Sequence, residues 1–311
     1  MIIANPIYDV VFKRMMENER VAKFFIGTLL EEEIEKVEVK PQEFTYVDEL
    51  AGLAVFRLDF IATIKTEKGE SKKVLIEIQK ARNYIDLMRF RNYLAEQYKK
   101  EDYIDNEKQI LPITTIYILG FTIPEIDSAC IKVERNYKDL IEKRIIEKKS
   151  EFVEKFTHDS YIVQVERITS RYQTKLDKLL SLFEQSYFIG DSKIIKEYPY
   201  PIDNEDIKLT AEILHYSGTN PGERKLIEME QEAWRSVNAM FEDKEKKYIK
   251  ALEETRKELE EEKKRAEEEK KRAEEEHLKL IETAKFLKSL NIDIQIIANK
   301  TGLSLQEIEK L

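Results

Sequence analysis

The 311-residue chain has little of several residue types, and each scarcity excludes a class of protein. A single cysteine, Cys130, excludes a disulfide framework. The three histidines, His158, His215 and His277, are far apart and lack metal-ligand spacing, so we expect no zinc site. No apolar run approaches the roughly 20 residues that cross a bilayer, and the start MIIANPIYDV lacks a signal-peptide pattern. These absences predict a cytoplasmic protein with no membrane partner.

Charged residues make up 37% of the chain, and the formal net charge is −9. An acidic protein is poorly suited to tight DNA binding, because lysines and arginines that neutralise phosphates supply much of the affinity. The charges are unevenly distributed, however: residues 65–100 contain ten Lys and Arg against five Asp and Glu. A locally basic groove on an acidic protein suits an enzyme that binds DNA transiently.

Residues 55–80 alternate in the way that predicts a β-hairpin with two different faces. Side chains at i and i+2 of a strand lie on one face. In each arm one face is apolar, and the two apolar faces of a hairpin turn toward the same core. The residues of these apolar faces are Phe56, Leu58, Phe60, Ala62 and Ile64, then Val74, Ile76 and Ile78. The opposite face therefore gathers Asp59, Glu77 and Gln79.

The turn of this hairpin predicts its register. Glu67-Lys68-Gly69 suits a three-residue loop with glycine in the left-handed conformation. That loop pairs Thr66 with Glu70 and, counting back, Asp59 with Glu77, at roughly 5 Å between Cβ atoms. Facing carboxylates repel each other, and a bound cation converts the repulsion into coordination. The alternative is an ordinary exposed polar face of an antiparallel sheet.

Asp59 followed by Glu77-x-Gln79 resembles the motif of the PD-(D/E)xK nuclease superfamily. The wider sequence is similar to one branch, the recombination-promoting nuclease or transposase family. Three stretches carry the resemblance: Asn5-Pro6 through Asp9-x-x-Phe12-Lys13, Arg57-Leu58-Asp59 and Ile76-Glu77-Ile78-Gln79. It covers residues 1–130 well and the remainder loosely. It implies an α/β protein with a restriction-endonuclease-like core in the order α-β-β-β-α-β.

The resemblance also implies a function, a metal-dependent DNA endonuclease. Asp59, Glu77 and the carbonyl of Ile78 are then ligands of one or two Mg²⁺ ions, for which Mn²⁺ can substitute. Gln79 replaces the lysine of the motif and orients the attacking water, and Leu58 replaces the proline before the motif aspartate. Asp9 is a further catalytic acid from the first helix; its alternative role is a first-turn acid favoured by the helix dipole.

DNA is the partner that the resemblance implies, and four basic residues near the motif are expected to contact it: Lys80, Arg82, Arg89 and Arg91. The loss of the motif lysine leaves a second function open. In that alternative the chain has a catalytically degenerate nuclease fold and acts as a DNA-binding or coiled-coil assembly protein.

The order of predicted elements divides the chain into four parts. Residues 1–135 form the nuclease core, with helices at 6–30 and 83–103 and strands at 37–47, 55–80 and 111–121. Residues 136–220 form a helical extension of the core, with a helix around 164–185.

Residues 221–284 are predicted to form a long charged helix. Leu252, Leu259, Ala266, Ala273 and Leu280 recur every seven residues, but the second apolar position of each heptad is mostly charged. This pattern leaves a weak coiled coil, with a homodimer, and a solvated single helix as alternatives. Residues 285–311 form a small helix-turn-helix-like tail, in which Ser304-x-x-Glu307 is a capping box.

Overall fold

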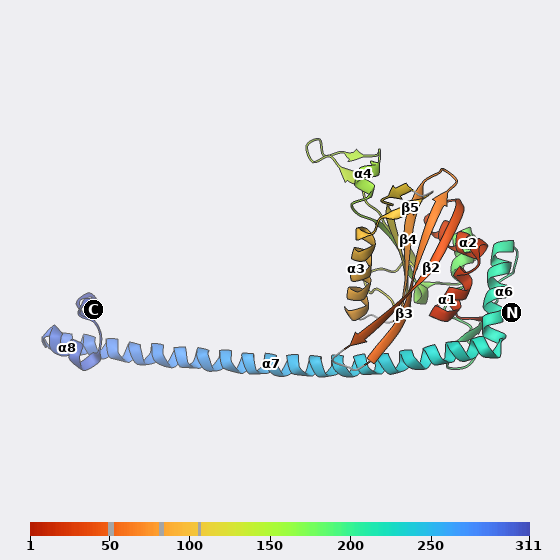
Figure 1. Cartoon of the computed structure of the whole chain (residues 1–311). Helices are drawn as coiled ribbons and strands as arrows, with labels where there is room; N and C mark the ends of the chain where they lie inside the picture. The colour runs from red at the N-terminus through yellow and green to blue at the C-terminus, as the bar shows by residue number, and fades with distance from the viewer. Residues whose placement is uncertain (49–52, 81–83, 105–106) are drawn as a thin grey trace. The chain divides into compact units, whose positions relative to one another are not determined.

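The computed structural model describes residues 1–48, 53–80, 84–104 and 107–311 and shows a mixed α/β protein. The chain forms two compact units, residues 1–238 and residues 239–311. In the first unit a six-stranded mixed sheet has α3 (Tyr84–Lys99) on one face and α1 (Asp9–Met16) with α2 (Glu19–Leu30) on the other (Figure 1).

The strand order of this sheet is β2-β3-β4-β7-β11-β8. The first three strands are antiparallel, the central strands β4, β7 and β11 are mutually parallel, and β8 returns antiparallel to β11. The strands are β2 (Ile34–Asp48), β3 (Leu53–Thr66), β4 (Ser71–Gln79), β7 (Ile113–Leu119), β11 (Asp159–Gln164) and β8 (Cys130–Val133).

The α1–α2 side of the sheet carries the main hydrophobic core. The apolar face predicted for the hairpin lies here, with Phe60, Ala62, Ile64 and Ile76 almost fully buried. Phe12 is at the centre of this core, because its ring centroid lies 5.0 Å from that of Phe60 and 5.2 Å from that of Phe25. Asn18 begins α2 by accepting hydrogen bonds from the N–H groups of Arg20 and Val21.

The second face of the sheet is covered by α3, which connects β4 to the parallel strand β7. Leu75 and Ile113 of the sheet pack against Phe90 and Tyr93 of α3. Tyr98, near the end of this helix, is 37% exposed. A hairpin of β5 (Asp102–Ile104) and β6 (Glu107–Gln109) follows α3. The helix–strand–strand–strand–helix–strand order predicted for residues 1–135 is otherwise present.

The prediction that residues 136–220 are helical is wrong for much of the segment. It supplies β11 to the main sheet, where Tyr161 and Val163 are buried between two neighbouring strands. The capping box of Thr174 and Asp177 starts a helix of only seven residues. The other elements are β9 (Tyr137–Lys138), β10 (Ile145–Ile146), α4 (Glu151–Glu154), η1 (Val165–Arg167), α5 (Lys175–Ser181), β12 (Ile195–Glu197) and α6 (Glu205–Thr219).

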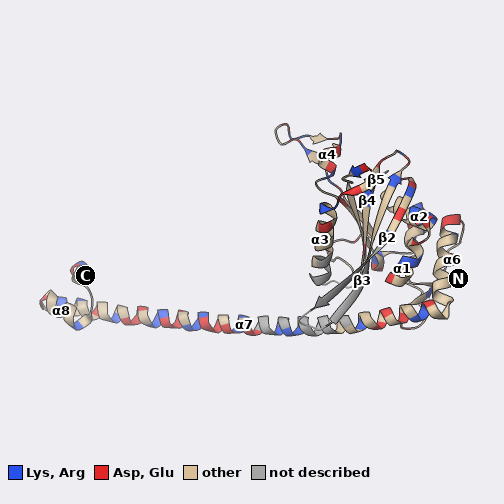
Figure 2. Cartoon of the chain, viewed as in Figure 1, with Lys and Arg blue, Asp and Glu red and all other residues tan. Residues whose placement is uncertain are grey.

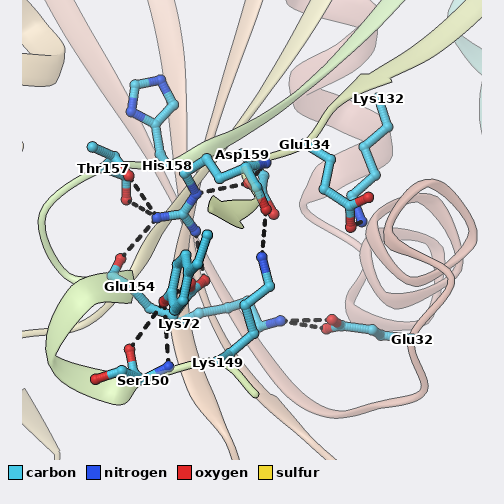
Figure 3. A network of polar contacts seen from close by, with 12 residues as sticks. Glu32, Lys72, Lys132, Glu134, Lys149, Ser150, Glu154, Thr157, His158 and Asp159 are labelled. Atoms are coloured by element: carbon cyan, nitrogen blue, oxygen red, sulfur yellow. Dashed lines mark hydrogen bonds and ion pairs between the residues drawn. The ribbon is translucent and has the colours of Figure 1, made fainter. Parts of the chain in front are cut away.

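The β9–β10 hairpin and α4 are held to the sheet by one arginine. The guanidinium of Arg135 donates to Asp159 Oδ1 at 2.7 Å, to Glu154 Oε2 at 2.6 Å and to the carbonyl of Thr157 at 2.8 Å. The acceptors Glu154, Thr157 and Asp159 lie close together in Figure 3, where dashed lines mark the hydrogen bonds. Charge-assisted bonds to several acceptors fix the base of this segment.

The long helix α7 spans Pro221–Ser289, as the sequence predicts. Its first turns belong to the first unit, because Ile227 and Trp234 are buried there, and the division between the two units falls within the helix, after Asn238. The later turns mix both charges along the helix (Figure 2). Leu259 and Leu280 of the heptad series are 52% and 39% exposed, which suits a solvated helix; the homodimer stays a prediction.

The end of the chain folds as its capping signals predict. Asn291 is left-handed with φ 59°, Gly302 ends α8 (Ile294–Thr301) with φ 73°, and the Ser304–Glu307 capping box starts α9 (Leu305–Lys310). The buried residues of this unit are Ala284, Ile297, Leu303 and Ile308. None of the helices in the described parts of the chain is long and apolar enough to cross a membrane.

Lys196 is an unusual member of the core of the first unit. It lies in β12 opposite Ile3 of β1 (Ile2–Ala4), is 2% exposed and donates to the carbonyl of Glu184. Burial lowers its pKa from 10.5 to about 7, and the nearby Glu184 charge opposes this shift only in part.

We expect Phe12→Ala to lower the free energy of unfolding by about 3–5 kcal/mol, because it empties a site enclosed by three other aromatic rings. Chemical denaturation measures the loss. Phe152→Ala, at a side chain 70% exposed, is the control and should change stability by less than about 0.5 kcal/mol. Equal losses in the two variants would contradict this core assignment.

We expect stability to rise with pH between about 7.5 and 8.5 in a way that depends on Lys196. In this window Lys196 is protonated in the unfolded chain but mostly neutral in the folded chain, so raising the pH favours folding. The gain in folding free energy is complete above the unfolded pKa of Lys196 and is lost as the pH falls toward 7. The slope is on the order of 1 kcal/mol per pH unit. Denaturation at several pH values should show a flatter profile for Lys196→Met than for the parent protein.

Candidate active site

The β3–β4 hairpin has the register that its sequence predicts. Thr66 N donates to the Glu70 carbonyl at 2.9 Å, Gly69 N donates to the Thr66 carbonyl at 2.9 Å, and Gly69 has a φ of 84°. The ladder then runs from Lys65 opposite Ser71 to Phe60 opposite Ile76. The positive φ is the reason for glycine in the turn.

The pairing between β3 and β4 ends at Phe60 and Ile76, while each strand keeps the partner on its other edge. β3 continues with β2 as far as Leu53, with Asp59 opposite Gln42, and β4 continues with β7 as far as Gln79. The next two residues past the last β3–β4 pair are Asp59 and Glu77. The predicted pairing of Asp59 with Glu77 is not part of the β3–β4 ladder, which ends one pair earlier, and the side chain of Asp59 lies outside the described residues.

Glu77 and Gln79 lie under α3 and are buried, with 1% and 8% exposure. The Cα partner of Glu77 in β7 is Tyr117, whose ring centroid is 4.7 Å from that of Phe90 in α3. Burial, with a contribution from the Glu77 charge, raises the pKa of Tyr117 to about 12. The alternative of an exposed polar sheet face is therefore wrong for Glu77 and Gln79, because a helix covers them.

The other predicted metal ligand and catalytic acid come from the opposite face. The side chain of Ile78 is in the main core, and its backbone lies opposite Ile118 of β7; metal binding by its carbonyl stays a prediction. Asp9 is the first residue of α1 and is 9% exposed. The N–H groups of Asp9 and Val10 at the start of α1 bond to Glu230, the ion-pair partner of Lys80, and the catalytic role of Asp9 stays a prediction.

A carboxylate from α7 joins three elements at this end of the sheet. Glu230 Oε1 accepts the N–H of Asp9 at 2.9 Å, and its Oε2 accepts the N–H of Val10 at 3.1 Å. Tyr8, the residue before α1, makes no side-chain cap, so Glu230 satisfies the free N–H groups of this helix. Glu230 also forms an ion pair with Lys80 at the end of β4.

Lys80 is enclosed by aromatic rings as well. Its Nζ lies 4.5 Å from the ring centroid of Tyr8 and 5.0 Å from that of Trp234, and its side chain is 11% exposed. Its ammonium group therefore serves internal contacts rather than the open surface that the predicted DNA contact requires. Of the other predicted DNA-binding residues, Arg91 is exposed on α3, and the side chains of Arg82 and Arg89 lie outside the described residues.

The donors that the hairpin provides suit a hard cation. The carboxylate of Glu77, the amide of Gln79 and a backbone carbonyl are oxygen donors, which Mg²⁺ prefers over the nitrogen and sulfur ligands typical of zinc. No group of three or more His, Cys, Asp or Glu side chains that could hold a metal occurs among the described side chains, of which Asp59 is not one.

Sequence reasoning missed Glu230, Trp234 and Tyr8 as neighbours of the candidate site. Glu230 is 150 residues from Lys80 and is one of many acids of α7. The Asn5-Pro6 stretch was a usable signal: the Asn5 amide donates to Gln185 Oε1 at 3.0 Å and to the carbonyl of Lys193 at 3.1 Å. It fixes the segment that leads into Tyr8 and Asp9.

Comparison with protein-family models finds no match to this chain, and comparisons with curated proteins and with solved structures find no significant similarity. Any function assigned to the chain therefore depends on its residues and on their arrangement.

We expect Glu230→Ala to lower the free energy of unfolding by about 1–3 kcal/mol, because it removes the acceptor for two N–H groups of α1 and the partner of a largely buried ammonium. The matched control is Glu228→Ala, at a partly exposed acid of the same helix that pairs only with Arg224; it should cost less than about 0.5 kcal/mol. Thermal and chemical denaturation compare the two. In Lys80→Met protein the Glu230→Ala loss should shrink, and an unchanged loss would mean that the two residues are not coupled.

Proposed function

We propose that this protein is a Mg²⁺-dependent DNA endonuclease of the PD-(D/E)xK type. The observation that carries the proposal is the separation of β3 and β4 immediately before Asp59 and Glu77. In this proposal the end of β3–β4 pairing at Phe60 and Ile76 leaves room beside the next two residues, Asp59 and Glu77, for an ion and a phosphodiester. Sites built on strands hold their geometry better than sites on loops.

The arrangement of elements supports the same proposal. A helix, three antiparallel strands, a covering helix and a strand parallel to the third follow in the order of a restriction-endonuclease-like core. Glu77 and Gln79 lie near the carboxyl end of β4, and the carboxyl ends of parallel strands are where open α/β sheets bind ligands. The resemblance to recombination-promoting nucleases rests on the residues around these positions.

In this proposal Asp59, Glu77 and the carbonyl of Ile78 hold the cation. A divalent cation bound there supplies activation of water and neutralisation of the phosphate charge. Gln79 orients the water through its amide, and Asp9 helps to order the start of α1 at the end of the sheet. The phenol of Tyr117 stays protonated at neutral pH beside Glu77 and adds no negative charge to the site.

In this proposal DNA is held mainly by arginine side chains that follow β4 in the sequence. Arg82, Arg89 and Arg91 precede or lie on α3, the helix that covers Glu77 and Gln79. The segment 65–100 has an excess of five positive charges in an acidic chain, which favours brief binding that weakens with salt.

A second function is favoured by one specific observation. Gln79 replaces the motif lysine, and the neighbouring lysine, Lys80, is tied to Glu230 and two aromatic rings. A site in which no lysine ammonium can reach the scissile phosphate suits a catalytically degenerate nuclease fold. Such a protein binds DNA or assembles through the later turns of α7. Metal-dependent cleavage separates this function from the first.

We expect Asp59→Ala and Glu77→Ala each to reduce Mg²⁺-dependent nicking of supercoiled plasmid by more than roughly 100-fold, because loss of a ligand's hydrogen-bond partner alone costs 10–100-fold. The matched control is Glu96→Ala, which removes an exposed carboxylate of α3 and should leave nicking unchanged. EDTA should stop cleavage by the parent protein.

Normal nicking by Asp59→Ala would remove this residue from the site. A folded parent protein that cuts DNA with neither Mg²⁺ nor Mn²⁺ would contradict the nuclease proposal and favour the second function, a catalytically degenerate fold that binds DNA or assembles.

A further inference from the structure

A pocket lies at the carboxyl ends of all three parallel strands of the sheet. Lys80 follows β4, Gly120 follows β7, and Glu166 follows β11 within η1; all three line the pocket. Its volume is about 350 Å³, at the lower end of the range of small-molecule sites. Open α/β sheets bind ligands outside these strand ends.

Close packing and hydrogen bonds fix the walls of the pocket. A Cβ on Gly120 would lie 2.8 Å from Ile7 Cδ1 and 3.1 Å from the Lys80 carbonyl, so glycine allows the close packing of its base. The 191–193 loop is tied to Asn5 through the Lys193 carbonyl, and Gln231 of α7 donates to the carbonyl of Ser192. These hydrogen bonds hold three separate segments around one cavity.

The charges that line the pocket do not all cancel in pairs. Lys80 is matched by Glu230, and Lys193 Nζ lies 3.9 Å from Glu166 Oε1. Arg235 and Asp191 also line the pocket, and neither forms an ion pair with any residue that the structure describes. The pocket therefore presents one guanidinium for an anion and one carboxylate that can accept a hydrogen bond from an amino group.

An aromatic wall lies beside these groups. Tyr8 and Trp234 both line the pocket, and the indole is 9% exposed. Burial and the nearby Glu230 raise the pKa of Tyr8 to about 12, so its phenol is neutral. A flat aromatic wall accepts a nucleobase of any sequence, because every base has a π-face.

We infer that this pocket binds a single nucleotide, with the phosphate at Arg235, an amino group of the base at Asp191 and the base against Trp234. The pocket volume of about 350 Å³ suits one nucleotide rather than a base pair. If the proposed nuclease function holds, the enzyme takes DNA with an unpaired nucleotide, at an end or in a single-stranded stretch. The inference about the DNA substrate rests on that proposal; the binding of a free nucleotide does not.

Trp234 makes the test direct, because it is the only tryptophan of the chain. The full-length protein is titrated in EDTA with dCMP, with dTMP, which lacks an exocyclic amino group, and with inorganic phosphate. Tryptophan fluorescence and equilibrium dialysis of labelled nucleotide are read together. We expect saturable binding of dCMP that is tighter than that of dTMP and phosphate.

Two pocket variants and one control assign the contacts. Arg235→Gln should weaken dCMP binding about tenfold or more, on the scale of one charge-assisted hydrogen bond. Asp191→Asn should reduce the preference for dCMP over dTMP. Lys225→Gln, at an exposed cation of the same helix outside the pocket, should bind as the parent does.

Several outcomes would overturn the inference: no binding by dialysis, phosphate binding as tight as dCMP binding, or equal losses in Arg235→Gln and Lys225→Gln. The binding titrations do not measure DNA cleavage. A protein that binds dCMP and cuts no DNA would defeat the nuclease proposal alone, and a protein that cuts DNA and binds no nucleotide would defeat the pocket alone.

Discussion

The double pairing of β4 is the constraint on which the rest of this structure depends. β4 is antiparallel to β3 on one edge, parallel to β7 on the other, and buried on both faces. A strand held on all sides cannot shift register by one residue without moving Ile76 and Ile78 out of the core and Glu77 into it. The positions of Glu77, Gln79 and Lys80 therefore follow from packing, before any chemistry is considered. The end of β3–β4 pairing at Phe60 and Ile76 then separates the two strands beside the acidic residues.

The carboxyl end of β4 is also where distant parts of the chain converge. α1 begins there, α7 closes over it, and the Glu230 carboxylate joins both helices to Lys80. In a largely buried setting a carboxylate that accepts two N–H groups and faces an ammonium is well compensated, whereas each partner alone would be costly to bury. The first turns of α7 are thus part of the folded unit that carries the candidate site and the pocket, although the sequence of the helix reads as one charged segment.

The hairpin, its turn and the terminal unit were predictable because each depends on local signals. Gly69 adopts a positive φ in the turn, and Asn291 and Gly302 adopt the left-handed conformation at helix ends. Alternation over 60–64 and 74–78 correctly divided the hairpin into two faces. The alternative of an exposed second face is wrong for Glu77 and Gln79, since α3 covers that face. A period-2 pattern shows which side chains share a face but not what packs on that face.

By itself the sequence determined the order of the main helices and strands in the first 121 residues, the β3–β4 register and the caps of the terminal helices, but not the short strands β1, β5 and β6. These depend on backbone conformations and side-chain alternation within a few residues. Only the tertiary structure decided that 159–164 joins the main sheet, that α7 is rooted in the first unit, and that Lys80 faces Glu230 and Trp234 rather than solvent. Those features depend on contacts between residues up to 221 positions apart, whose formation is governed by the packing of the whole unit and leaves no local pattern.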